Sequence, residues 1–488
     1  MKNLFSIFLL ASVISSLSLF AQEIPTDSLY LGQTPPHNTP KIFNLPLTSG
    51  HRACERIAIT SDGKEIYFGE LNTYPPTSYR VKSLKYFDDK WQGPFNLFEG
   101  FTAPKLSVND SVLFLQNNLF YTYYSKRTST GWSVPVRLLS KNMRTHYFQQ
   151  TNPDNSYASS YYEGSPRDGN LCKLITVNQD TILQSLGIPL NSSIQENDFF
   201  IAADESYVFF SRNATGGAGD IYLSFKKDSG GWTNPKNLGA PINKPGNSWE
   251  YGQFVSNDNK YLFFTSGGLS MGSYYTYWVK IDNLIDSLRH TNFVPYLNYK
   301  IPDQIDSVGY AYNYTFPDTT FVDDDGNNTL TYSSTLSNGN PLPSWLNFDS
   351  STRTFTGTSV TVDNYFIKVT ATDTANAKAF CTFNLKIENP VTDITKDHQS
   401  LKEYRLYQNY PNPFNPTTTI EFAIPKSGRY SLGLYNTLGQ LIKVIAKKEY
   451  ETGYYKETLD ATGLSSGMYI YRLSGNDANL LRKLVVLR

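Results

Sequence analysis

Alternating runs of apolar and polar residues, joined by short polar turns, recur along the first part of the chain. The stretch "IAITSDGKEIYFGE" (57–70) reads as a strand, a tight turn and a second apolar strand, and "FIAADESYVFFSR" (200–212) and "FVSNDNKYLFFTS" (254–266) repeat it. Weaker copies begin at Lys105 and Gln149. A period of two predicts β-strands, and Asp, Asn and Gly accept the backbone angles of tight turns. The pattern therefore predicts five β-hairpins.

Each hairpin is followed by a third, aromatic-rich strand, and three of the five then continue into a shared phrase. The phrase reads "KWQGPFNL" from Lys90, "GWSVPVRL" from Gly131 and "GWTNPKNL" from Gly231. Four strands in about 40 to 50 residues is the size of one β-propeller blade. We expect the phrase to lead into the outermost strand, where a proline is tolerated. The residues expected to cover the blade edges are Trp91, Trp132 and Trp232.

The fifth unit stops at "WVKIDNLIDSLR" without this phrase, and a similar segment, "TPKIFNLPLTSG" (39–50), stands near the N-terminus. An N-terminal strand that completes the last blade would close the ring and remove two exposed sheet edges. We therefore predict an all-β propeller with five blades, and six blades is the alternative.

The propeller region resembles the TolB-like group of secreted propellers with WD-like repeats. The segments "YLGQTPPHNTPKIF", "TSDGKEIYF" and "GGAGDIYLS" carry the resemblance, which covers residues 24–289. Proteins of this group differ widely in function, so the resemblance implies a fold and no particular activity.

From Val294 to Pro390 about seven short alternating strands predict an Ig-like sandwich. The segments "LPSWLNFDSSTRTFTGT", "YFIKVTATD" and "FVDDDGNNTLTY" make it similar to the cadherin-like Ig modules of bacterial surface proteins. We expect Trp345 and Leu346 to fill its core.

The acidic turn "VDDDG" (322–326) in this domain suggests a calcium site, because Ca²⁺ prefers hard oxygen ligands. The expected ligands are Asp323, Asp325 and Asp373. The alternative interpretation is an ordinary Asx-rich turn with no metal, since EF-hand spacing is absent.

The last segment of the chain closely resembles the type A C-terminal sorting domain of type IX secretion. The motifs that carry this are "YPNPFNPTTTIEF" (410–422), "YNTLGQLI" (435–442), "LSSGMYIYRL" (464–473) and the terminal "KLVVLR". The resemblance implies a small β-sandwich that the type IX machinery recognises as a partner. It also implies cleavage in the polar linker 391–404 and attachment of the protein to the cell surface.

The first residues, "MKNLFSIFLLASVISSLSLFAQ", predict a secretory signal peptide, with a membrane anchor as the weaker alternative. No later apolar stretch is long enough to span a membrane. The expected organisation is a signal peptide (1–21), a propeller (22–293), an Ig/cadherin-like domain (294–390), a linker (391–404) and a sorting domain (405–488).

Composition narrows the possible partners. Lys and Arg total 43 and Asp and Glu also total 43, so the chain has no basic excess to bind nucleic acid. The three cysteines are far apart in the sequence and fit no zinc motif, and we expect them to be small buried side chains. The five histidines show no paired metal spacing, and no Ser-His-Asp or Cys-His motif is present.

Candidate site residues follow from the hairpin turns. Counting seven residues back from each turn marks the start of the inner strand, where a propeller usually binds ligands at one mouth of its channel. This count selects Glu55, Thr102, Tyr147, Asn197 and Glu250, with His51, Arg52, His146, Asp198 and Trp249 beside them. The expected ligand-binding set is His51, Glu55, His146, Tyr147, Asn197, Asp198, Trp249 and Glu250.

Two functional hypotheses remain open from the sequence. The first is a secreted, surface-attached binding protein for carbohydrate or another surface polymer, because aromatic side chains stack on sugars without needing charge. The second is a glycan-active hydrolase or lyase in which Glu55 and Glu250 face each other as paired carboxylates.

Overall fold

The structure is a computed structural model. It describes residues 23–72, 76–139, 143–160, 169–178, 180–213, 219–246, 248–268, 274–390, 403–412, 414, 416–437, 439–465 and 467–486. The predicted signal peptide (1–21) and residues 391–402 of the predicted linker lie outside the described residues.

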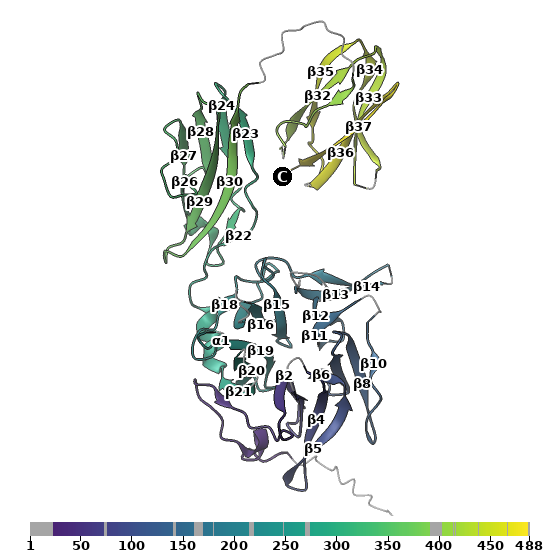
Figure 1. The fold of residues 1–488 in the computed structure, drawn as a ribbon, viewed down its shortest axis with the longest axis vertical. Helices are drawn as coiled ribbons and strands as arrows, with labels where there is room; N and C mark the ends of the chain where they lie inside the picture. Colours follow the sequence, from purple (N-terminus) through teal and green to yellow (C-terminus); the bar gives the residue numbers. More distant parts are fainter. Residues whose placement is uncertain are drawn as a thin grey trace, which may run out of the picture. The chain divides into compact units, whose positions relative to one another are not determined.

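The described residues between 41 and 280 form antiparallel units of mainly four strands arranged around a common centre (Figure 1), and a parallel pairing of Gly219 with Trp249 joins the last two units in one sheet. From the centre outward, the first unit is β2 (Arg52–Ile59), β3 (Glu65–Leu71), β4 (Tyr79–Phe87) and β5 (Lys90–Glu99). The second is β6 (Phe101–Leu106), β7 (Val112–Asn117), β8 (Thr122–Thr128) and β10 (Val136–Arg137), with β9 (Gly131–Trp132) also on β8. The third is β11 (Thr145–Asn152), β12 (Asn155–Ser160), β13 (Leu171–Val177) and β14 (Asp180–Ser185). The fourth is β15 (Glu196–Ile201), β16 (Tyr207–Asn213), β17 (Gly219–Phe225) and β18 (Lys236–Asn237). The fifth is β19 (Ser248–Val255), β20 (Tyr261–Gly268), β21 (Tyr275–Lys280) and β1 (Lys41–Ile42).

The fifth unit takes its outermost strand from the N-terminal side of the chain. Strand β1 pairs antiparallel with β21, so that Lys41 lies opposite Trp278 and Ile42 opposite Tyr277. This confirms the prediction that segment 39–50 supplies the missing strand. The inner strands β2 and β19 are also in contact, which joins the fifth unit to the first and closes the ring.

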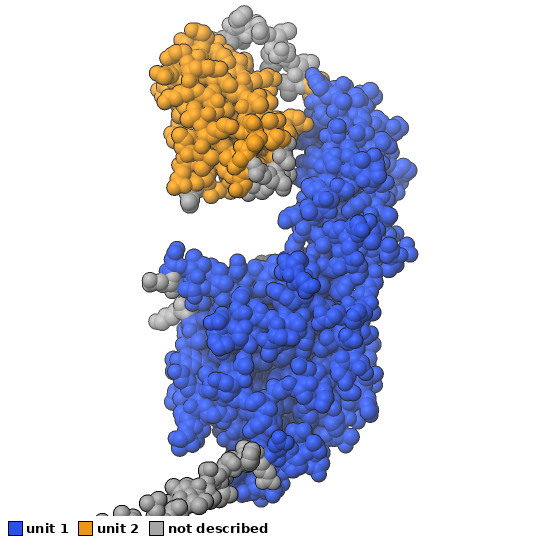
Figure 2. All heavy atoms as spheres, turned by 180° about the vertical axis from the view of Figure 1, so that it is seen from behind, with its two compact units in different colours: residues 1–388 blue, residues 389–488 orange. Residues whose placement is uncertain are grey.

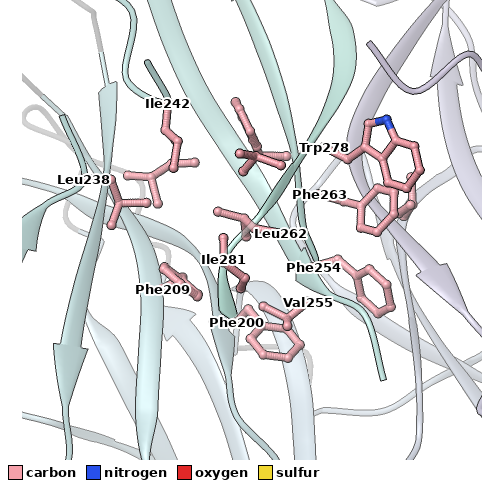
Figure 3. Packing of buried hydrophobic residues seen from close by; sticks show 14 of the residues in the cluster. Phe200, Phe209, Leu238, Ile242, Phe254, Val255, Leu262, Phe263, Trp278 and Ile281 are labelled. Carbon is pink, nitrogen blue, oxygen red and sulfur yellow. The ribbon is translucent and has the colours of Figure 1, made fainter. Parts of the chain in front are cut away.

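The largest apolar core lies among the first, fourth and fifth units and includes Phe43 beside β1, and Figure 3 shows part of it. Phe263 and Trp278 stack with ring centroids 5.5 Å apart, and Phe43, which follows β1, meets both rings edge-on. Burial of these large rings binds the N-terminal strand to the last unit, because apolar surface removed from water stabilises the folded state.

The three tryptophans of the repeated phrase do more than cover blade edges. Trp232 is 2% exposed and packs in a core shared by the third and fourth units. Trp132 of the second unit donates its indole N–H to Tyr67 Oη of the first unit at 3.1 Å. Trp91 donates to the backbone oxygen of Ser28 at 2.7 Å. In these three units the tryptophan of the phrase therefore connects the unit to a segment that precedes it in the sequence.

One helix was not predicted by the alternating pattern. Helix α1 (Asp282–Arg289) follows β21, and its Leu284, Ile285 and Leu288 pack against the large core. Lys236 donates from Nζ to the backbone oxygen of Leu288 at 2.6 Å, so a cation satisfies a carbonyl of the last turn. Two 3-10 turns, η1 (Leu29–Gly32) and η2 (Asn327–Thr329), complete the helical elements of the described chain.

The middle domain is a sandwich of two sheets with a short extra pair. One sheet orders β23 (Gln304–Ser307), β30 (Lys378–Glu388), β29 (Asp363–Thr372) and β26 (Thr331–Leu336). The other orders β24 (Ala311–Thr315), β28 (Thr354–Thr358) and β27 (Leu346–Asp349), while β22 (Tyr296–Leu297) pairs with β25 (Phe321–Val322). Leu346 is buried in the core as predicted, and Trp345 is half-buried against it. The three cysteines of the chain, Cys54, Cys172 and Cys381, are buried as predicted, and none of them forms a disulfide bond.

The C-terminal domain is a second sandwich, and it forms a compact unit of its own (389–488, Figure 2). One sheet orders β31 (Arg405–Leu406), β32 (Thr417–Ile424) and β35 (Gly453–Asp460). The other orders β34 (Leu441–Tyr450), β33 (Gly428–Tyr435), β36 (Gly467–Gly475) and β37 (Ala478–Val486). The last strand holds the "YPNPFNP" segment: the N–H of Val485 donates to Asn412 Oδ1 at 2.8 Å, and the N–H of Phe414 donates to the Val485 oxygen at 3.1 Å.

Candidate functional site

Each inner strand carries a β-bulge at the same structural position. The register of β2, β6, β11, β15 and β19 against its neighbour slips immediately after Cys54, Thr102, His146, Asn197 and Tyr251. The next residue in every case has a positive φ, and these residues are Glu55, Ala103, Tyr147, Asp198 and Gly252. Bulges re-aim side chains and are frequent beside functional sites. The ring centre, which we define as the space between these five strands, is therefore lined by bulge residues.

This register corrects the count of seven residues back from each turn. The count is right for Glu55 and Tyr147, but the bulge falls one residue later than Thr102 and Asn197 and two residues later than Glu250. The turns of four units have the same length, since Ile59 lies opposite Ile66, Leu106 opposite Leu113, Ile201 opposite Val208 and Val255 opposite Leu262. The bulge of β2 contains one residue more than the other bulges, and the count for the fifth unit began one residue early in its turn, so the count does not keep the inner strands in register.

Three ligand-type side chains from three different units meet at the ring centre. Single donor or acceptor atoms of Glu55, His146 and Asp198 all lie within 4.8 Å of one another. His146 Nδ1 is 2.9 Å from Asp198 Oδ1, yet this oxygen takes part in no hydrogen bond. The Tyr147 hydroxyl donates to Glu55 Oε2. Glu55 and His146 are half-buried and Asp198 is 3% exposed, so solvent reaches the cluster from one side.

Burial and charge crowding both act on this cluster. Burial, followed by the neighbouring carboxylate of Asp198, raises the pKa of Glu55 to about 7, although His146, the Tyr147 hydroxyl and Arg56 act in the opposite direction. Among the residues that the structure describes, His146 is the only basic side chain within ion-pair distance of either carboxylate. The site therefore holds two closely spaced acids with little compensating charge.

Arg56 lies beside the cluster and was not selected from the sequence. Its guanidinium carbon is 4.8 Å from the centre of the Tyr147 ring, and its Nη2 donates to the Phe148 oxygen at 2.5 Å. Its Nε and Nη1 are buried without a hydrogen-bond partner. Burial lowers the pKa of Arg56 to about 10, which shows how strongly this position is shielded from water.

Glu250 is not part of the cluster. It is 0% exposed, and its carboxylate accepts hydrogen bonds from Ser266 Oγ at 2.8 Å and Ser248 Oγ at 3.3 Å. The carboxylate beside Glu55 is that of Asp198, so the expected facing pair of Glu55 and Glu250 is replaced by Glu55 and Asp198. Glu250 instead supports the start of β19.

The other selected residues occupy supporting positions. Asn197 is 7% exposed and accepts from the Gln195 amide at 3.3 Å. Trp249 is half-buried, packs edge-on to Tyr251 with centroids 6.1 Å apart, and leaves its buried indole N–H unpaired. His51 is half-buried, and its Nδ1 lies 3.3 Å from the Ser49 oxygen.

A buried lysine crosses the ring centre at a second level. Lys105 of the second unit is 9% exposed, and its Nζ lies 4.6 Å from the Phe200 ring centre and 5.4 Å from that of Phe254. Burial, with the charge of Arg56, lowers the pKa of Lys105 to about 7. The aromatic rings give this cation partial compensation through cation–π contacts. No sequence motif identified Lys105 as a residue of the ring centre.

A hollow of about 500 Å³ lies elsewhere, between the turns of the first and second units. Its charged lining residues already pair with one another, as in the 2.8 Å contact between Arg127 Nη2 and Glu65 Oε2. It therefore offers weaker grounds for a functional site than the ring centre, where polar atoms are unpaired.

The acids of the middle domain do come close together, and burial, with repulsion from Asp325 and Asp373, raises the pKa of Asp323. Most of their oxygens accept from protein N–H groups. Asp373 accepts from Ala377 N at 2.7 Å and from the Asn292 amide at 2.9 Å, and Asp325 accepts from Phe293 N at 2.5 Å. Only Asp323 Oδ2 is buried without a partner. The calcium site stays a prediction.

Two family models match the chain outside the propeller. Residues 294–388 match the family described as "Putative Ig domain", and residues 408–487 match the secretion system C-terminal sorting domain. The second match indicates export through type IX secretion, as the C-terminal motifs predicted. No curated protein matches the chain.

Solved structures that overlay on the chain include propeller proteins at low similarity. TolB from Acinetobacter baumannii is 12% identical, with 46% of this chain and 54% of TolB covered and a TM-score of 0.29. Oligogalacturonate lyase in complex with manganese is 10% identical, with 48% and 66% covered and a TM-score of 0.29. Periplasmic gluconolactonase PpgL from Pseudomonas aeruginosa is 11% identical, with 83% and 88% covered and a TM-score of 0.29.

The chain thus spans about half the length of the TolB structure. Overlays this loose carry no argument about activity, and the ring described above is established by the strand pairing of this chain. No helix in the described part of the chain is long and apolar enough to cross a membrane.

Proposed function

We propose that this secreted protein is a binding protein attached to the cell surface, and that its propeller binds carbohydrate at the ring centre. The observation that carries the proposal is the meeting of Glu55, His146 and Asp198 in a half-open, buried cluster. Carboxylates and an imidazole exchange hydrogen bonds with sugar hydroxyls, and a protein concentrates such groups where a ligand replaces water.

Aromatic side chains beside the cluster support the choice of ligand. Tyr251 is half-buried and has the half-buried Trp249 and Tyr274 as its ring neighbours, at 6.1 and 6.3 Å. Aromatic faces pack on the C–H surfaces of sugar rings without any need for ligand charge. A chain with equal numbers of acidic and basic residues fits a neutral polymer better than a polyanion.

A glycan array tests the proposal. The wild-type protein is expected to retain a defined group of neutral or weakly charged glycans, and Asp198→Asn is expected to weaken that binding at least about tenfold, because it removes a charged acceptor. Asp204→Asn is the matched control, since Asp204 is an exposed turn residue of the same unit. Binding that is equal for wild type and Asp198→Asn would remove the ring centre from the proposal.

The second candidate is a glycan-active hydrolase or lyase, now with Glu55 and Asp198 as the carboxylate pair. The observation that favours it is their closeness, because an oxygen of each carboxylate lies within 4.8 Å of the other, and retaining glycosidases use two carboxyl groups that lie close together. Release of reducing sugar from a bound glycan, abolished by Glu55→Gln, would establish this alternative. Binding without release would exclude it for that glycan.

Attachment of the protein to the cell surface can be tested separately from glycan binding. We propose that the C-terminal domain is removed after export, within residues 391–404. Mass spectrometry of the surface form is then expected to find the propeller and middle domain without any peptide of 408–487. Recovery of those peptides from the surface form would contradict removal of the domain.

A further inference from the structure

We infer that Glu55, His146 and Asp198 form a binding site for one divalent transition-metal ion, of the zinc or manganese type. Their ligand atoms lie within 4.8 Å of one another although the three residues belong to the first, third and fourth units. The inference goes beyond the proposed function, because metal binding is measurable without any glycan.

The geometry of the two closest atoms points to a shared ligand. Asp198 Oδ1 and His146 Nδ1 are 2.9 Å apart, and the buried Asp198 Oδ1 takes part in no hydrogen bond, so the two atoms are close enough to share one ligand. Two atoms that bind one zinc ion at 2.0–2.2 Å lie about 3.0 to 3.5 Å apart. An almost fully buried carboxylate oxygen without a partner is costly unless something compensates it.

The charges also fit a dication. Two carboxylates and a neutral imidazole balance the charge of M²⁺, and the Arg56 guanidinium, although it lies beside the cluster over the Tyr147 ring, is not within ion-pair distance of either carboxylate. The donor set is one nitrogen and two oxygens. Imidazole favours zinc and related ions, and carboxylates also suit manganese, whereas Ca²⁺ prefers oxygen ligands alone.

The surrounding structure orients the ligands. The Tyr147 hydroxyl donates to Glu55 Oε2 and leaves the other oxygen of Glu55 for the metal. Thr265 Oγ1 donates to the Glu55 backbone oxygen at 2.7 Å, which holds the bulge in place. Such outer contacts fix the orientation of metal ligands.

Titration of the chelator-treated, full-length protein with Zn²⁺ or Mn²⁺ alone tests the inference. Calorimetry is expected to give one ion per chain, with Ca²⁺ binding much more weakly. Each of Glu55→Gln, His146→Ala and Asp198→Asn is expected to lower the affinity by about 100-fold or more, since each removes a direct ligand. The matched controls are Asp204→Asn and His290→Ala, which alter exposed residues of the same types.

A spectroscopic readout protects the test against variants that misfold. Co²⁺ bound to the wild-type protein is expected to show the intense visible absorption of a low-coordinate site with nitrogen and oxygen ligands, and Zn²⁺ is expected to displace it. Absence of stoichiometric binding, binding unchanged in folded ligand variants, or a Co²⁺ spectrum identical to that of the ion in buffer would overturn the inference.

Discussion

The C-terminal domain and the ring centre place their key residues in opposite ways. In the C-terminal domain the landmark motifs are contiguous stretches, and the terminal strand β37 pairs along β36 and binds Asn412 and Phe414 of the first motif. At the ring centre the residues that meet are Glu55, His146 and Asp198, which are far apart in the sequence and share no motif. A contiguous recognition element can therefore be identified from the sequence alone, whereas a site assembled from several bulges cannot.

Removal of the terminal strand gives the largest expected effect. Deletion of Lys483–Arg488 takes the buried Leu484 and Val486 from the core and leaves Asn412 without its backbone partner. The sandwich is then expected to lose its recognition surface, so the protein accumulates in the periplasm and disappears from the medium and cell surface. Cell fractionation measures this.

Lys483→Ala is the control for this deletion, because that side chain is exposed and only its backbone oxygen is used, by Gln408. It is expected to be exported normally. Normal export of the truncated protein would show that the terminal strand is dispensable, and the contrast between the two regions would then disappear.

Gly252→Ala tests whether the bulges hold the ring centre together. A Cβ at Gly252 would lie 2.6 Å from the backbone carbon of Glu55 and 2.9 Å from Arg56 N, and its φ of 68° is unfavourable for alanine. Backbone atoms cannot move aside as a side chain can, so a loss of about 3 kcal/mol in unfolding free energy is expected. Denaturant unfolding measures it.

Gly239→Ala is the control that distinguishes the effect of the positive φ angle from the effect of the steric clash at Gly252. Gly239 has a φ of 62° but nothing within 4 Å of an added Cβ. It is expected to lose only about 1 kcal/mol, from backbone strain alone. Equal losses for the two variants would mean that the close approach of the fifth unit to Glu55 does not matter for stability.

Lys105→Met tests the second level of the ring centre through pH. The folded-state pKa of Lys105 is lowered to about 7 from 10.5, so between these values the unfolded chain holds a proton that the folded chain has released. Stability attributable to Lys105 therefore rises with pH across that window, by at most about 1.4 kcal/mol per pH unit. The methionine variant is expected to be more stable at pH 6 and to lack this rise. Thermal unfolding at several pH values gives the comparison, and parallel curves for the two proteins would contradict it.

The smallest effect is expected from calcium in the middle domain. If Asp323, Asp325 and Asp373 bind Ca²⁺, millimolar Ca²⁺ is expected to raise the midpoint temperature of the unfolding transition of the middle domain by a few degrees, measured by calorimetry. The reason is that only the folded state binds the ion. Asp323→Asn should remove the shift and Asp349→Asn, in an exposed turn of the same domain, should keep it. Identical curves with calcium and with chelator would end the calcium hypothesis.

Much of the fold could be predicted because it depends on local pattern. Period-two alternation identified the hairpins, and the Trp-containing phrase marked the outermost strands β5, β10 and β18. Helix α1 was not predicted because it is short, and the sequence was searched for the alternating apolar and polar residues of β-strands. Its apolar Leu284, Ile285 and Leu288 carried the only available signal.

The candidate site could be predicted only in part. The chemistry-bearing residues Glu55, His146, Tyr147 and Asp198 were selected, but Glu250 was given a role at the ring centre that belongs to no residue of its strand, since Gly252 occupies that position. Arg56 and Lys105 were passed over because a lone cation in an apolar strand has no motif.

The sequence by itself determined the strand pattern, the closure of the ring by an N-terminal segment and the sorting domain at the C-terminus, because each is encoded in neighbouring residues. Only the tertiary structure decided which acid lies beside Glu55. A one-residue slip turns a strand's side chains to the other face, and β6, β11, β15 and β19 each contain such a slip at the bulge, whereas the bulge of β2 contains two extra residues. The pairing of Glu55 with Asp198 rather than Glu250 therefore depends on where five separate bulges fall around the ring, and no local pattern records that.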